Sequence, residues 1–314
     1  MSGKRWLMLA IALASCCRVQ AQDADSLLTV PNDSILSYSD SLSIFYLIDS
    51  LIALEENSGS QLAVRMAYNS NVLSAGRTLG IDQFGLSPGV SFYHTSGLFA
   101  DVSSYWSKDF DPKYYLTTLS VGYMHTFSSK FSVMGSYDRF IYNLEDDYTP
   151  FTNGLTVSPY FDLKPFLIQL DYSYYFGDGY ANRLMPSLSV YLTKRKLLGI
   201  DKISFIPAFY LLLGDQTFTN IIIPSTRAEW IRAYLRMQQG LPWYQTETYR
   251  EFGIMNYSIS MPLSIQHKNF SFLVSYVYSI PKSLPSETLT LPETGFLAAS
   301  VTYYIPLKRK IMEW

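Results

Sequence analysis

Long segments of alternating apolar and polar residues dominate the chain from residue 61 to residue 307. In KPFLIQLDYSYYFGDG, every second residue from Phe166 to Phe176 is apolar or aromatic, and Gln169 and Asp171 lie between them. A β-strand turns successive side chains to opposite faces, so such a segment has one apolar and one polar face. The pattern predicts twelve strands, at about 61–71, 87–96, 98–107, 114–127, 131–143, 152–162, 166–176, 180–193, 201–213, 251–265, 269–280 and 295–307.

The lengths of these strands and of their connections favour a membrane barrel. Each strand has about 10 residues or more, as a tilted strand needs to cross a bilayer, whereas strands of soluble proteins average about five or six. Connections of about 15, 6, 8, 3, 37 and 14 residues alternate with connections of about 1, 3, 3, 7 and 3 residues. This alternation predicts short periplasmic turns, long outer loops and both termini in the periplasm.

Composition agrees with an apolar exterior. Hydrophobic residues make up 48% of the 314 residues and charged residues only 16%, and the chain has 26 tyrosines. Ordinary soluble domains have about 25% charged residues. The net charge of −2 argues against a nucleic-acid partner. We therefore predict an all-β fold, a single closed antiparallel transmembrane β-barrel of about 12 strands, with 14 as the alternative.

The N-terminal region reads as an export signal followed by a short extension. Residues 1–21 have a basic start, an apolar stretch and a small-residue cleavage site at Ala21, whereas Leu13–Cys16 resembles a lipobox that would leave Cys16 acylated. The only cysteines, Cys16 and Cys17, lie here, so a chain cleaved after Ala21 has no thiolate site. Residues 22–60 form a periplasmic extension with an expected helix over 41–56, either against the barrel mouth or inside the lumen, and residues 61–314 form the barrel.

The chain resembles the uncharacterised outer-membrane β-barrel proteins of Bacteroidota-type Gram-negative bacteria. The resemblance rests on the signal ending QAQ, the repeated hairpins, and the late stretch FGIMNYSISMPLSIQHKNFSFLVSYVYSIPKSLPSE. It implies an integral outer-membrane protein that is folded by the barrel-insertion machinery. Such barrels often end on an aromatic residue, but here Lys308, Arg309 and Lys310 separate the last strand from the terminal Trp314.

The longest connection, the outer loop 214–250, carries its own helix signal. Thr226 and Glu229 match a capping box, and Gly240 ends the pattern, which predicts a helix over 227–239 that covers the outer opening. The same segment could instead alternate as extra strands, which would give fourteen. Candidate loop contacts, either for lipopolysaccharide phosphate or as a solvated face, are Arg227, Trp230, Arg232 and Arg236.

Charged and amide residues at inward positions are the candidate lumen lining. These are Arg65, Asp101, Asp138, Asp171, Arg183 and Asn256. Such groups either line a solute path or close an electrostatic network that blocks it. Because most of these charges are acidic, a conducting lumen would be expected to favour cations.

Signals of catalysis are weak. The chain has no Walker loop, dinucleotide fingerprint, HExxH or GxSxG motif, and we expect no cofactor, no metal and no catalytic residue. His94, His125 and His267 all fall at the periplasmic side, away from where an outer-leaflet hydrolase would need them. The predicted function is a narrow pore or passive solute channel. The alternative is a non-catalytic envelope scaffold that acts through its loops or N-terminal helix, followed by an outer-membrane hydrolase. The expected partners are outer-membrane lipid and lipopolysaccharide.

Overall fold

The computed structural model describes residues 59–70, 85–108, 112–143, 151–197, 199–285, 287 and 291–307. All of them belong to the compact unit Asn32–Trp314. The export signal, the helix expected over 41–56 and the C-terminal segment 308–314 lie outside the described residues. Within the described part, no helix is long and apolar enough to cross a membrane.

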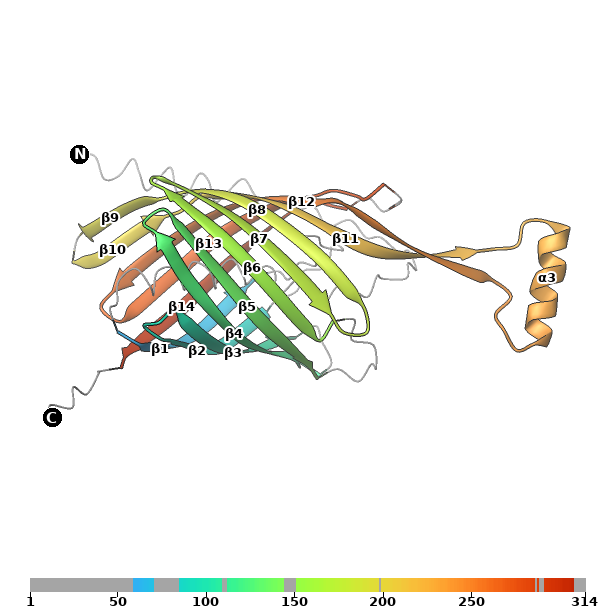
Figure 1. Cartoon of the computed structure of the whole chain (residues 1–314), viewed down its shortest axis with the longest axis horizontal. Helices are drawn as coiled ribbons and strands as arrows, with labels where there is room; N and C mark the ends of the chain where they lie inside the picture. Colours follow the sequence, from blue (N-terminus) through green and yellow to red (C-terminus); the bar gives the residue numbers. More distant parts are fainter. Residues whose placement is uncertain are drawn as a thin grey trace. The chain divides into compact units, whose positions relative to one another are not determined.

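The described residues form strands and a single helix, coloured along the sequence in Figure 1. The elements are β1 (Gln61–Asn69), β2 (Gly85–Tyr93), β3 (Leu98–Ser107), β4 (Tyr114–Ser128), β5 (Phe131–Tyr142), β6 (Asn153–Leu163), β7 (Phe166–Phe176), β8 (Tyr180–Val190), β9 (Leu192–Leu197), β10 (Ile200–Phe205), β11 (Ala208–Ile222), α3 (Arg227–Gln238), β12 (Gln245–His267), β13 (Phe270–Pro281) and β14 (Thr294–Pro306).

Antiparallel pairing closes these strands into a ring. Neighbours run from β11 through β8 and down to β1, then through β14 and β13 to β12, and β12 pairs with β11. This ring contains twelve strands, as the sequence predicts. Closure gives each of the twelve ring strands two hydrogen-bonded neighbours, so the ring has no open sheet edge that would be costly in hydrocarbon.

The two remaining strands, β9 and β10, continue β8 and β11 rather than adding to the ring. β9 pairs with β10, and β10 pairs with the end of β12 that β11 leaves free. The breaks fall at Tyr191 and at Ile206–Pro207, and Pro207 lacks the N–H that a continuous ladder requires. The predicted strands 180–193 and 201–213 are therefore each interrupted once.

The apolar faces point away from the lumen. In β7, Ile168, Leu170 and Tyr172 are 43%, 39% and 45% exposed, whereas Gln169 and Asp171 are 5% and 8% exposed. Large exposed hydrophobic side chains occur on the outer face of every strand of the ring. A contiguous apolar exterior of this kind around a polar interior is the arrangement of a barrel that spans a membrane.

Aromatic rings cluster on the outer face near the short turns. Phe131 lies between Phe127 and Phe161, with ring centroids 5.5 and 4.8 Å away. On the β13–β14 side, Phe270 lies 4.7 Å from Tyr303. Bands of aromatic side chains mark the level of the lipid headgroups in membrane barrels.

β11 and β12 extend beyond their neighbours as a two-stranded hairpin. The pairing of β11 with β8 ends at Gly214, and that of β12 with β13 ends at Asn256. The pairing of β11 with β12 nevertheless continues to Ile222 and Gln245. The segment predicted as the loop 214–250 thus contains the outer halves of two strands, with α3 between their ends (Figure 1).

Helix α3 begins with the capping box that the sequence indicates. The Thr226 side chain accepts a hydrogen bond from the Glu229 N–H (3.3 Å), and the Glu229 carboxylate accepts from the Thr226 N–H (3.0 Å). After the helix, Gly240 adopts a φ of 75°, a conformation that glycine takes without strain. The prediction of a helix is confirmed, and the alternative of extra ring strands at 227–239 is wrong because local capping favours helix here. The expected position over the outer opening is not observed, because α3 follows the far end of the β11–β12 hairpin.

The capping carboxylate makes α3 sensitive to acid. Hydrogen bonds from the backbone N–H groups of Ser225 and Thr226 lower the pKa of Glu229 from its ordinary 4.5 to about 2. Since the folded-state pKa is the lower one, the carboxylate stabilises the helix above pH 4.5, and this contribution is lost as pH falls toward 2. We expect near-UV circular dichroism of the stacked Trp230–Trp243 pair to change over this range. In Glu229→Gln, which keeps a hydrogen-bonding side chain but does not titrate, this transition should be absent.

Candidate functional site

The interior of the barrel is lined by small and polar side chains. On the β12–β13 wall, the Ser260 and Ser275 hydroxyls lie 3.0 Å apart, and those of Ser258 and Ser279 lie 3.3 Å apart. Asn256, one of the predicted lumen residues, is 2% exposed and donates a hydrogen bond to the Ser258 hydroxyl at 2.6 Å. This wall presents hydroxyl and amide groups, which suit a hydrated interior.

Two further predicted lumen residues, Arg65 and Asp101, form a buried ion pair. The Arg65 Nη2 lies 3.5 Å from the Asp101 carboxylate and donates a hydrogen bond to the Ser103 hydroxyl at 2.9 Å. The Ser91 and Ser103 hydroxyls in turn donate to Asp101. A Cβ on Gly89 would lie 3.0 Å from the guanidinium and 2.7 Å from the Ser103 hydroxyl, so only glycine leaves room for this network.

Asp138 and Asp171 point inward as predicted but lie against neutral partners. The Ser120 hydroxyl donates to Asp138, and the Gln169 amide donates to Asp171 at 2.7 Å. These contacts hold both carboxylates against the barrel wall.

Arg183 belongs to a second charged cluster, at the base of the projecting hairpin. Asp215 lies 3.6 Å from Arg183 and 2.5 Å from Arg250, and it accepts hydrogen bonds from both the backbone and the side chain of Asn182. The Arg250 guanidinium also lies 3.7 Å from the centre of the Tyr180 ring. Sequence reasoning missed Asp215 and Arg250 because it placed both in a loop. The sequence offers no alternating signal there, because residues 245–252 are mostly polar.

The predicted loop contacts lie apart from the lumen residues. Arg227, Trp230, Arg232 and Arg236 are all on α3, at the end of the hairpin. Trp230 stacks on Trp243 with ring centroids 5.8 Å apart, and it is 48% exposed.

Buried aromatic side chains gather inside the barrel toward its long-loop end. They form an apolar cluster with ring centroids 6.1–6.4 Å apart between neighbours. The rings are those of Tyr105, Tyr115, Phe140, Phe151 and Tyr175. The rings of this cluster occupy more of the lumen than small side chains would at the same positions.

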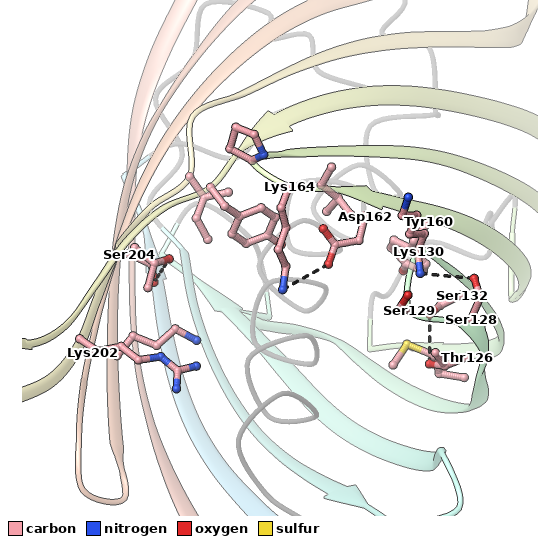
Figure 2. A pocket seen from close by; sticks show the side chains of 17 residues that line it. Thr126, Ser128, Ser129, Lys130, Ser132, Tyr160, Asp162, Lys164, Lys202 and Ser204 are labelled. Carbon is pink, nitrogen blue, oxygen red and sulfur yellow. Dashed lines mark hydrogen bonds and ion pairs between the residues drawn. The ribbon is translucent and has the colours of Figure 1, made fainter.

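The short-turn end, in contrast, contains a cavity of about 810 Å³ (Figure 2). Its lining includes several hydroxyl side chains and four basic ones: Lys130, Lys164, Arg195 and Lys202. Sequence reasoning did not single out these residues, because they come from separate turns and strands. We refer to this cavity as the basic vestibule.

All three histidines lie in the part of the chain that the structure describes. That part contains no cluster of three or more His, Cys, Asp or Glu side chains able to hold a metal ion. His94 and Ser96 do lie 2.9 Å apart, but the Ser96 N–H also donates to the His94 ring, so the contact belongs to an exposed turn. His267 lies 3.6 Å from Asp201 at another turn.

Comparison with known proteins finds distant structural likeness. No family model matches the chain, and no curated protein matches its sequence. Among solved structures, the KdgM porin has a TM-score of 0.44 at 10% identity, covering 77% of this chain and 98% of that chain. The NanC porin has a TM-score of 0.39 at 11% identity, with the same two coverages. OprD from Pseudomonas aeruginosa has a TM-score of 0.34 at 12% identity, covering 81% of this chain and 68% of that chain. The fold described above rests on the strand pairing, independently of these scores.

Proposed function

We propose that the protein is a passive channel for small hydrophilic solutes in the outer membrane of a Gram-negative bacterium. The observation that carries this proposal is the ring of twelve strands, which is apolar outside and contains a cavity of about 810 Å³ with hydroxyl and charged side chains in its lining. A soluble protein would bury such apolar faces, whereas a membrane barrel exposes them to lipid and keeps polar groups in its lumen.

The orientation follows from the lengths of the connections. Short turns join the strands at the end that holds the basic vestibule, and Gln61 of β1 pairs with Pro306 of β14 at this same end. In outer-membrane barrels the short turns face the periplasm. The proposal therefore places the vestibule and both ends of the strand ring at the periplasmic side, and α3 outside the cell.

The source and partners follow from the same proposal. The signal ending QAQ and the repeated hairpins support a Bacteroidota-type barrel, delivered by the insertion machinery. The exposed apolar faces would contact lipid, and Arg227, Arg232 and Arg236 on the outer helix are available to lipopolysaccharide phosphate.

In this function the lumen divides into a wide and a narrow part. The basic vestibule admits solutes at one end, and the aromatic cluster around Phe140 and Tyr175 limits their size toward the other. Hydrogen-bonded serines between them can replace part of a solute's hydration shell.

Planar-bilayer recording of the purified protein tests the proposal. Discrete conductance steps are expected, and Phe140→Ala with Tyr175→Ala should increase the step size because two rings leave the narrow part. Phe161→Ala on the outer face is the matched control and should leave the step unchanged. Absence of conductance from correctly folded barrels, in both wild type and widened variant, would contradict the channel function.

The projecting hairpin favours a second candidate, an envelope scaffold that acts through α3. Most apolar side chains of the helix are about half exposed, including Trp230, Ile231, Tyr234 and Leu235. Replacing residues 219–248 by a two-residue turn keeps Asp215 and Arg250 in place. If α3 attaches the protein to a partner at the cell surface, this deletion should abolish that attachment and leave the conductance unchanged. If α3 covers the opening, the deletion should raise conductance.

A further inference from the structure

We propose that the basic vestibule binds anionic solutes, namely small molecules with two or more carboxylate or phosphate groups, and makes the channel anion-selective. This inference rests on the proposed channel function and names the class of its solutes. It differs from the cation preference expected from the number of acidic lumen residues.

The basic side chains converge on the cavity from four separate segments. Lys130 lies in the turn between β4 and β5, and Lys164 in the turn between β6 and β7. Arg195 and Lys202 come from β9 and β10. Figure 2 shows Lys130, Lys164 and Lys202 around the same hollow. A convergence of segments separated by some seventy residues is a property of the folded barrel rather than of a local basic run.

The register of β9 and β10 places two like charges side by side. Arg195 pairs directly with Lys202, and both line the cavity. Like charges on directly opposed residues destabilise a sheet. Lys202 is also only 5% exposed. The register therefore gives this wall of the cavity two adjacent cationic side chains.

The negative charge at the cavity wall is small. Asp162 is the carboxylate among the residues that line the cavity, and its nearest oxygen lies 3.8 Å from the Lys164 ammonium. The Lys164 side chain is 75% exposed, so this contact is a weakly coupled surface pair. Tyr160 and Tyr191, which also line the wall, are neutral at physiological pH. Among the described residues, the lining therefore has four cationic side chains and one carboxylate.

The other acidic groups of the described residues near these strands lie outside the cavity lining. Asp101 is paired with Arg65, and Asp215 lies between two arginines at the far end. Asp201 accepts a hydrogen bond from the Lys268 N–H and lies beside His267, at a turn. Asp138 and Asp171 remain as acidic groups of the lumen wall, but neither lines the vestibule.

Hydroxyl groups complete the lining. Thr126 and Ser132 lie 3.0 Å apart on one side of the cavity, and Thr193 and Ser204 lie 3.0 Å apart on the other. Hydroxyls and ammonium groups together donate hydrogen bonds to carboxylate or phosphate oxygens. A volume of about 810 Å³ is large enough for a small polyanion and is within the usual range for ligand pockets.

Ion selectivity in planar bilayers is the first test. In a gradient of KCl at low salt, the reversal potential of the wild type should favour chloride over potassium roughly tenfold, the lower end of what a charged cleft achieves. Arg195→Gln with Lys202→Gln should reduce this preference to less than half. The matched control is Lys194→Gln with Lys196→Gln, which removes two charges from the same strand β9 at positions that do not line the cavity. In this control, the preference for chloride over potassium should be unchanged.

A second variant guards against misfolding of the first, because Lys202 is buried. Lys130→Glu with Lys164→Glu changes two exposed residues in turns and should invert the preference toward potassium. Citrate and inorganic phosphate, added at the vestibule side, should interrupt the wild-type current at concentrations where glucose does not. Comparison of the two anions shows whether the vestibule binds phosphate groups, carboxylate groups or both.

The outcomes distinguish this inference from the channel function. Conductance without anion preference would contradict anion selection by the basic vestibule, but not the channel function. The same holds for a preference that both pairs of glutamine substitutions leave unchanged. Absence of any conductance would instead overturn the channel function on which the inference rests.

Discussion

Replacing Arg65 with methionine is expected to destabilise the barrel by about 3–5 kcal/mol, the cost of removing one partner from a buried ion pair. Asp101 is 3% exposed, and its charge would then lie in the wall with only the Ser91 and Ser103 hydroxyls as partners. Methionine approximates the length of the arginine stem, so the loss of packing is small. Guanidinium unfolding in lipid vesicles, followed by tryptophan fluorescence, measures the effect.

Two controls separate charge from packing. Arg139→Met removes an arginine whose contacts, with the Thr152 carbonyl and the Asn153 side chain, are exposed, and it should cost much less. Adding Asp101→Asn to Arg65→Met should recover a large part of the stability. Equal losses in the single and double variants would show that the ion pair is not the source of the effect.

Replacing Leu170 with arginine is expected to cost about 2–4 kcal/mol, the value for a cation on the lipid face at the bilayer midplane. Leu170 lies midway along β7, is 39% exposed and points away from the lumen. A charge there loses its hydration to hydrocarbon, whereas the same charge in a water-facing sheet would cost little. Unfolding in vesicles, compared with unfolding in detergent of shorter chain length, measures the cost.

Asp171→Asn is the matched control, one residue along the same strand. Its side chain is inward and accepts a hydrogen bond from Gln169, which asparagine also accepts. We expect a far smaller loss than at Leu170. The opposite order of losses would mean that the two faces of β7 are exchanged.

The strands themselves could be predicted from sequence because lipid and lumen impose opposite demands on alternate residues. In β7 the observed bounds are those expected from the pattern, since Phe166 to Phe176 alternate without a break. Helix α3 was equally predictable from Thr226 and Glu229, because a capping box acts locally. These features need no knowledge of which strands are neighbours.

The outer halves of β11 and β12 do not show this alternation of apolar and polar residues. Strands that leave the bilayer have no lipid face, so polar residues such as Thr246, Thr248 and Arg250 look like a loop in the sequence. The interruption at Pro207 lies inside the strand that was predicted as continuous over 201–213. Across this break, the Val190 N–H donates a hydrogen bond to the Pro207 carbonyl.

The charged sites depended still more on the fold. Arg65 and Asp101 were each expected inward, but their pairing follows from the adjacency of β1, β2 and β3. The basic vestibule brings together Lys130 and Lys202, which are far apart in sequence and unremarkable in composition. Only closure of the ring and the register of β9 with β10 place such side chains around one cavity.

The central claim, a membrane barrel with lipid outside and water inside, is tested most directly by a spin-label scan of β7. Single cysteines at positions 167–175, in a chain whose Cys16 and Cys17 are cleaved off or replaced, are labelled in lipid vesicles and probed with oxygen and with a water-soluble nickel complex. The predicted result is a period of two: oxygen accessibility is greatest at positions 168, 170 and 172, and nickel accessibility at 169, 171 and 173. Uniform accessibility to nickel along the strand, or a maximum for oxygen at 169 and 171, would contradict the account.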